Sequence, residues 1–101
     1  MAIYAVSFRL DYDGNYDTRY ERLTNAIRAE ANGPRYWEES TSFMLLESNK
    51  QPSALADSIV AASRLDEKRD LLLAIYLSGS RGHAIRGHYT DKDIIQLLKD
   101  R

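Results

Sequence analysis

The sequence predicts an α+β fold, because strand patterns and helix patterns alternate along its 101 residues. Apolar side chains recur at period two in residues 2–10 and at three- and four-residue steps in residues 16–31, and residues 70–78 form an almost continuous apolar run. The length suits one compact unit. We therefore expect a single domain over residues 1–101, with its core in residues 2–78 and a C-terminal loop and helix in residues 79–101.

The N-terminal third predicts a strand, a polar turn and a helix. One face of the strand is apolar and ends at Leu10, and residues 11–15 (DYDGN) have turn composition. A helix should follow from about Tyr16 to Ala31, with Asn15, Asp17 and Thr18 competing as its N-cap. Residues 32–34 (NGP) then end it. The apolar stripe of this helix consists of Tyr16, Tyr20, Leu23, Ile27 and Ala31.

The remaining two thirds predict a hairpin, a helix, a strand and a last helix. Residues 36–38 and 41–47 are the hairpin strands, and Pro52 begins a helix that runs to about Arg64 with Leu55, Ile59 and Ala62 as its stripe. Residues 70–78 predict a strand covered on both faces. Residues 79–87 should be a flexible or tightly turning segment, and Thr90 should cap the last helix with Asp93 at its third position.

The element order strand, helix, strand, strand, helix, strand predicts a ferredoxin-like βαββαβ sandwich with a short extra C-terminal helix. Both long helices would cover one sheet face, and an apolar second face favours a homodimer. The alternative is that the C-terminal helix folds back over that face. The residues expected there are Ile3, Ala5, Met44, Leu72, Ala74 and Tyr76.

A resemblance to a known group rests on three stretches of the sequence. The start IYAVSFRL with its helix YDTRYERLTNAIRAE, the hairpin YWEESTSFMLLES and the strand LLLAIYL resemble the small VapD-like and SinR-like proteins, relatives of the CRISPR-associated adaptation nuclease. The likeness covers residues 2–78 in element order. It implies a ferredoxin-like homodimer and, for several members, a metal-dependent ribonuclease or deoxyribonuclease.

At the position of the main acidic residue of that family, this chain has an arginine. The family pattern at the end of the first strand is aromatic, Asp, apolar, and the matching residues are Phe8, Arg9 and Leu10. A one-residue slip would place Asp11 in the role of the acid, although it would also turn over the faces of the strand. With this slip the resemblance implies Mg²⁺ or Mn²⁺ as a cofactor and Asp11 as its ligand. The alignment without the slip keeps the faces of the strand and is preferred, and it puts Arg9 in the place of the acid.

The residues themselves also make Asp11 and Asp13 candidate catalytic acids. Two acids spaced by two in an extended segment project to the same side and can share a hard cation. Asp-x-Asp-Gly before a helix is also ordinary turn composition. Both interpretations stay open at this point.

The segment from Gly79 to Tyr89 is the best candidate for nucleic-acid contact. It contains Arg81, His83 and Arg86 beside glycines and without an acid, which suits phosphate oxygens, and Arg9 is a further candidate. The alternative is a solvated connector. His83 and His88 lie five apart, which is not the spacing of a helical zinc site.

Composition excludes several classes of function. The sequence has no cysteine, which rules out thiolate chemistry and fits a cytoplasmic protein, and it has no run long enough to span a membrane. With 14 Lys and Arg against 15 Asp and Glu, attraction to RNA or DNA must come from a local patch. We expect a nucleic-acid-associated homodimer, and as the alternative a non-catalytic dimerisation or protein-interaction module. A small-ligand sensor lacks a convergent polar set.

Overall fold

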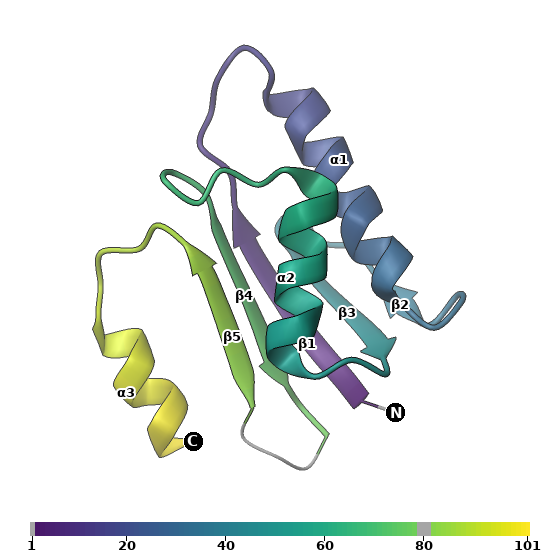
Figure 1. Ribbon diagram of the computed structural model, residues 1–101, viewed down its shortest axis with the longest axis vertical. Coiled ribbons are helices and arrows are strands. Elements are labelled where there is room, and N and C mark those ends of the chain that lie inside the picture. The colour runs from purple at the N-terminus through teal and green to yellow at the C-terminus, as the bar shows by residue number, and fades with distance from the viewer. Residues whose placement is uncertain (1, 79–81) are drawn as a thin grey trace.

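A five-stranded antiparallel sheet with two helices on one face forms the centre of the molecule (Figure 1). The computed structural model of the protein describes residues 2–78 and 82–101. The strand order is β2-β3-β1-β4-β5. The predicted ferredoxin-like α+β fold with an extra C-terminal helix is confirmed, and β5 is an additional strand. The elements are β1 (Ala2–Arg9), α1 (Tyr16–Glu30), β2 (Tyr36–Trp37), β3 (Phe43–Ser48), α2 (Pro52–Ser63), β4 (Leu71–Tyr76), β5 (His83–Gly87) and α3 (Asp93–Asp100).

The two long helices begin and end close to their predicted bounds. Pro52 is the first residue of α2, where its missing N–H costs no helical hydrogen bond. Gly33 follows α1 with a φ of 58°, as the predicted stop signal requires. Asn15 is the N-cap residue of α1, but its side chain makes no capping bond. Ala62, predicted to be in the stripe of α2, is exposed, and Ala56 is buried in the core instead.

The core lies between the sheet and the two helices. Alternate residues of the central strands point into it, and the pairing of β1 with both β3 and β4 places their side chains side by side. Tyr4, Val6, Leu55, Ile59 and Leu72 are fully buried. The remaining large side chains of this cluster are Phe8, Leu23, Ile27, Met44, Leu46 and Leu65.

The predicted residues of the open sheet face are partly wrong. Ile3 and Ala5 lie on that face as expected, but Met44, Leu72, Ala74 and Tyr76 lie on the helix face. The reason is the register, because Val6 pairs with both Met44 and Ala74, and paired residues share a face of the sheet. The open face is nevertheless apolar. It carries Ile3, Ala5, Phe43, Leu45, Leu71, Leu73, Ile75 and Ile85.

Residues 83–87 form the edge strand β5, so the prediction of a flexible or turning segment across 79–87 is wrong for this part. The strand pairs with β4, whose outer backbone groups would otherwise lack partners. Gly87 makes the pairing possible. Its φ is 102°, and a Cβ on it would lie 2.0 Å from the backbone oxygen of Asp70.

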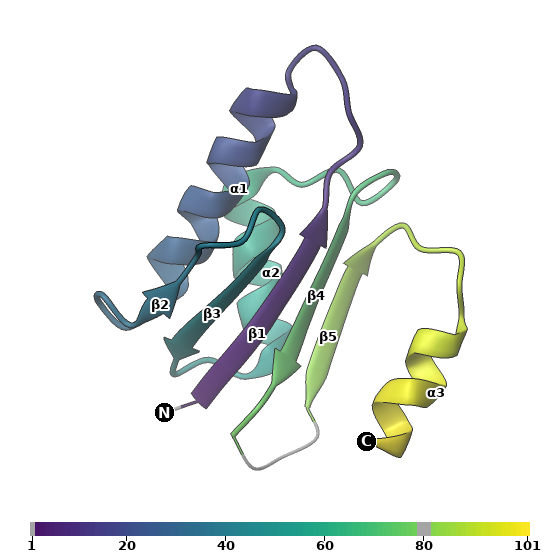
Figure 2. The same ribbon diagram turned by 180° about the vertical axis from the view of Figure 1, so that it is seen from behind.

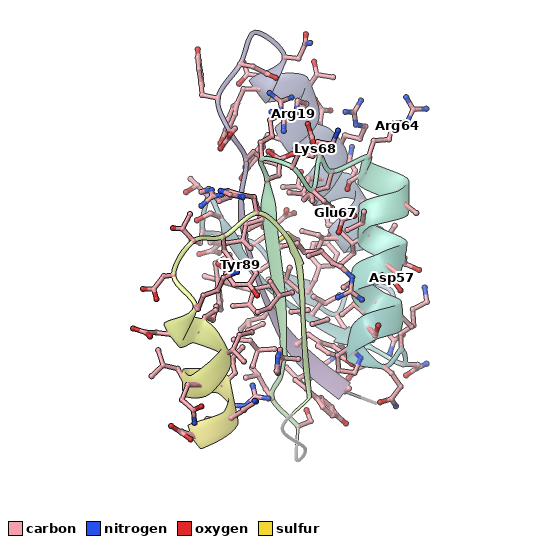
Figure 3. The ribbon with its side chains drawn as sticks, turned by 60° about the vertical axis from the view of Figure 1, so that its left-hand side comes forward. Arg19, Asp57, Arg64, Glu67, Lys68 and Tyr89 are labelled. Atoms are coloured by element: carbon pink, nitrogen blue, oxygen red, sulfur yellow. The ribbon has the colours of Figure 1, made fainter. Side chains whose placement is uncertain are left out.

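Helix α3 lies beside β5, on the side of the sheet opposite to α2 (Figures 1, 2 and 3). Together Leu71 of the open face and Ile94 and Leu97 of α3 line a small pocket, so α3 covers only the β4–β5 side of that face. The predicted cap is wrong. Lys92 is the N-cap residue, and the carboxylate of Asp91 accepts the N–H of Asp93 at 2.9 Å, because α3 starts three residues after Thr90.

No helix in the described part of the chain is long and apolar enough to cross a membrane.

Candidate anion-binding groove

A polar groove of about 500 Å³ opens where the start of α1 meets the segment between α2 and β4. Figure 3 shows Arg19, Arg64 and Lys68 at this end of the molecule. Four arginines and two aspartates are among its lining residues, together with Asn15 and Thr18. The charged residues are Asp13, Arg19, Arg22, Arg64, Asp66 and Arg69.

The segment after α2 takes its shape from one left-handed residue and a tight turn. Arg64, the C-cap residue of α2, has a φ of 58°, and its N–H donates to the backbone oxygen of Val60 at 2.9 Å. Left-handed geometry is costly for a residue with a Cβ. Leu65 is then buried in the core, and the backbone oxygen of Asp66 accepts N–H groups from Arg69 and Asp70. Arg64 thereby lies in the lining of the groove with its side chain exposed.

Asp70 is the buried anchor of the groove. Its carboxylate pairs with Arg19 and accepts the N–H groups of Asp11 and Asp66, each at 3.0 Å. The backbone oxygen of Asp11 accepts a further hydrogen bond from Arg19 at 2.7 Å. One carboxylate therefore holds together the end of β1, the start of α1 and the loop before β4.

The buried ion pair shifts both partners toward their charged forms. Burial by itself disfavours the ionised carboxylate of Asp70, but the hydrogen bonds from Arg19, Asp11 and Asp66 outweigh it, and the pKa of Asp70 lies below its ordinary value. The hydrogen bond to Asp70 raises the pKa of Arg19. The pKa of Asp13 is also lowered, first by the N–H of Asn15 and then by Arg69 and Arg19. The floor of the groove is therefore charged at neutral pH.

Three cations at the groove have no carboxylate partner in the described part of the chain. Arg22 donates its Nε to the backbone oxygen of Ser63 at 2.8 Å, which leaves the two terminal nitrogens of its guanidinium without a described partner. The side chains of Arg64 and Lys68 are exposed and form no described ion pair. In contrast, Arg69 binds Asp13 at 2.8 Å and Asp66 at 3.1 Å. The two acids of the lining are thus ion-paired, whereas Arg22 and Arg64 of the lining, with Lys68 beside them, form a positively charged rim.

This arrangement suits an anion with several oxygens. A guanidinium can donate two parallel hydrogen bonds to a phosphate, and an ammonium adds a movable point charge. The hydroxyl of Thr18 lies on the same wall and is a further donor. The donors of the groove therefore suit the oxygens of a phosphate group.

The two predicted acids have different surroundings. The carboxylate of Asp11 is exposed, and only the backbone of this residue takes part in the network around Asp70. The carboxylate of Asp13 accepts the N–H of Asn15 at 2.9 Å and pairs with Arg19 and Arg69. Asp13 is thus already engaged by cations. Among residues 2–78 and 82–101, no three His, Asp or Glu side chains gather closely enough to hold a metal ion.

The predicted phosphate-binding residues do not converge in one place. Arg9 is exposed and donates to the backbone oxygens of His88 at 2.9 Å and Arg69 at 3.3 Å. Arg86 reaches across to α2 and binds Asp57 and Ser53, each at 2.9 Å. His83 pairs with Ile75 and therefore lies on the open face of the sheet, whereas Arg86 lies on the helix face. Arg81 lies outside the described residues.

The sequence interpretation assigned no role to residues 64–69 (RLDEKR), which lie between the second predicted helix and the strand 70–78. The available signal was the density of charge, with three cations in six positions between two apolar elements. Arg19 and Arg22 lie outside the apolar stripe predicted for the first helix, and yet Arg19 is buried. Only the folded chain brings these two segments together.

Comparisons with known proteins give no relative: no family model, no curated protein and no solved structure matches this chain.

Proposed function

We propose that the protein is a homodimer that binds nucleic acid through the phosphates of its backbone. The observation that carries this proposal is the positively charged rim of the groove, where Arg22, Arg64 and Lys68 lack carboxylate partners in the described part of the chain. The net charge of the whole chain is −1, so only such a local patch can supply the attraction that a polyanion requires. The resemblance to the VapD-like and SinR-like group, which includes nucleases, favours the same class of ligand.

The open sheet face supports the homodimer part of the proposal. Ile3, Leu45, Leu73 and Ile75 are only half-buried in the isolated chain, and they adjoin one another across β3, β1 and β4. A contiguous apolar face marks an interaction surface, and a two-fold copy offers a matching one. Trp37, 42% exposed, extends this face at its β2 edge and contacts the ring of Phe43 with centroids 6.3 Å apart.

Metal-dependent cleavage, with Asp11 as the acid and Mg²⁺ or Mn²⁺ as the cofactor, remains a proposal taken from the resemblance. The exposed carboxylate of Asp11 is free to bind a cation, whereas that of Asp13 is occupied by two arginines. The alternative is a non-catalytic dimerisation or protein-interaction module, which Arg9 at the place of the family acid favours.

One set of assays separates these possibilities. Purified protein is mixed with labelled single-stranded RNA and with duplex DNA, in Mg²⁺, in Mn²⁺ and in chelator, beside Asp11→Ala. Salt-sensitive binding without cleavage supports a binder, and cleavage that needs metal and is lost in Asp11→Ala supports a nuclease. If neither binding nor cleavage is observed, the result favours the non-catalytic interaction module.

The dimer is tested by light scattering. We expect twice the 11.6 kDa mass of one chain, and a shift toward the monomer in Leu45→Glu, which places a charge on the open face. Ala61→Glu on α2 is the control, because Ala61 is exposed on the helix side of the sheet, away from the open face. A mass near 11.6 kDa at every concentration would contradict the homodimer.

A further inference from the structure

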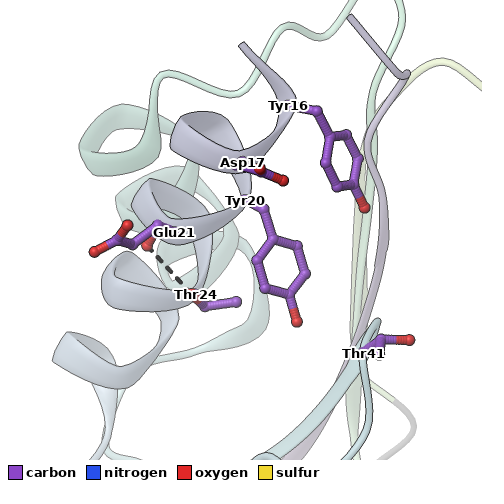
Figure 4. A pocket seen from close by; sticks show the side chains of 6 residues that line it. All are labelled: Tyr16, Asp17, Tyr20, Glu21, Thr24 and Thr41. Carbon is purple, nitrogen blue, oxygen red and sulfur yellow. Dashed lines mark hydrogen bonds between the residues drawn. The ribbon is translucent and has the colours of Figure 1, made fainter. Parts of the chain in front are cut away.

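A second cavity, of about 510 Å³, lies on the side of α1 away from the groove. Its walls are the rings of Tyr16 and Tyr20, with Thr24 of α1 and Thr41 of the segment before β3 (Figure 4). We call it the tyrosine pocket. The two rings project side by side from α1 toward the sheet, and Asp17 points to the same side of the helix in this view. The proposed nucleic-acid function makes no use of it.

The rings of the tyrosine pocket belong to a row of four aromatic rings joined by three contacts. Tyr12 lies against Tyr16 at 5.6 Å between centroids, Tyr16 stacks on Tyr20 at 6.1 Å, and Tyr20 contacts Phe8 at 6.0 Å. Phe8 is buried in the core, and Tyr12 at the other end is 87% exposed. Tyr20 is therefore held against the core, and Tyr16 packs on Tyr20, which gives the pocket wall a fixed inner end.

All the charge on the lining of the tyrosine pocket is negative. Asp17 and Glu21 are its charged residues, and neither forms an ion pair in the described part of the chain. The hydroxyl of Thr24 already donates to the backbone oxygen of Glu21 at 3.2 Å. Aromatic faces carry negative potential, so rings and carboxylate attract the same sign of charge. The pocket is therefore complementary to a cation.

The lining also indicates the kind of cation. A primary ammonium carries three N–H donors that all need acceptors, whereas the larger part of the pocket surface is apolar. A methylated ammonium has apolar methyl groups around its charge, and it can contact ring faces without leaving a donor unpaired. We propose that the tyrosine pocket binds the methylated ammonium group of a small organic cation.

Choline and its neutral isostere 3,3-dimethylbutan-1-ol are the probes. They have the same shape and differ in charge, so the ratio of their affinities measures the electrostatic contribution to binding. We expect choline to shift the Tyr16 and Tyr20 ring resonances saturably, with an affinity at least about fivefold above that of the isostere. Equal affinity for the two probes, or no ring shift with choline, would overturn the proposal.

Variants test the residues. Asp17→Asn and Tyr16→Ala should each weaken choline binding by about threefold or more, and Tyr16→Phe should keep most of it because the ring remains. Asp17 is exposed, so its variant tests the proposal even if Tyr16→Ala folds poorly. Tyr36→Ala is the matched control, because Tyr36 is a 39% exposed tyrosine outside the pocket. Two results together would contradict the proposal. They are an unchanged choline affinity in Asp17→Asn, and choline-induced shifts of the Tyr20 ring as large as in the wild type in a folded Tyr16→Ala variant.

Discussion

The guanidinium of Arg19 binds the fully buried carboxylate of Asp70, and this pair connects α1 to the start of β4 beneath the groove. The same carboxylate accepts the N–H groups of Asp11 and Asp66. A helix, a strand end and a loop therefore depend on one side chain. The stability of the groove and its charge pattern have a common origin in this contact.

Loss of the Asp70 carboxylate should be strongly destabilising. Asp70→Ala leaves Arg19 without its buried partner and two N–H groups without acceptors, so we expect the free energy of unfolding to fall by about 3–5 kcal/mol. Asp57→Ala is the control, because the pair of Asp57 with Arg86 is exposed and should contribute less than about 1 kcal/mol. Denaturant titration measures both. Similar losses in the two variants would show that Asp70 is no anchor.

The same carboxylate should make stability depend on pH in the acid range. The pKa of Asp70 is lower in the folded protein than in the unfolded chain, where it is about 3.9. Its contribution is then complete above the unfolded value and disappears as pH falls through the folded value. We expect the stability difference between wild type and Asp70→Asn to shrink from about pH 5 to about pH 3 in denaturant titrations. A difference that stays constant over this range would contradict the pairing.

Gly87 should tolerate no side chain. A Cβ at this position would lie 2.0 Å from the backbone oxygen of Asp70, and the φ of 102° is itself unfavourable for alanine. Gly87→Ala should therefore lower the free energy of unfolding by at least about 2 kcal/mol. Gly14→Ala is the control, because nothing lies within 4 Å of a Cβ there. Thermal melts of the two variants should differ clearly, and equal melting temperatures would be inconsistent with the β4–β5 pairing.

Much of the fold could be predicted from local sequence, because periodicity and helix signals act over short distances. The stop at Gly33 and the start at Pro52 are examples. The sequence could not predict which residues of β3 and β4 face the helices. Met44 and Leu72 stand in unbroken apolar runs, where no polar residue indicates the solvent-facing side. Register between strands decides such cases.

The groove and β5 could not be predicted for a related reason. Arg19 looks like a residue of a solvated helix face until its partner Asp70, 51 positions later, is brought against it. Residues 83–87 have little strand composition, and they pair because β4 presents a free edge and Gly87 permits the approach. Tertiary contacts therefore outweigh local preference in both regions.

Arg64 offers a variant that separates binding from stability. Glycine is the preferred residue in the left-handed geometry that Arg64 adopts, so Arg64→Gly should raise the free energy of unfolding by about 0.5–1 kcal/mol. It also removes one cation from the rim, so affinity for nucleic acid should fall in the same variant. Denaturant titration and fluorescence anisotropy on one preparation check both. A variant that is more stable and binds as well as the wild type would remove Arg64 from the proposed site.

The salt dependence of binding to a labelled single-stranded RNA tests the proposed role of the groove most directly. If Arg22 and Arg64 contact phosphates, Arg22→Gln/Arg64→Gln should weaken binding and reduce the slope of log affinity against log salt by about 1.4, from about 0.7 for each lost contact. The control Arg35→Gln/Lys50→Gln removes the same charge from exposed residues that pair with Glu47 and Glu30, and its slope should match the wild type. Equal slopes and affinities for the groove variant and the wild type would contradict nucleic-acid binding at this groove.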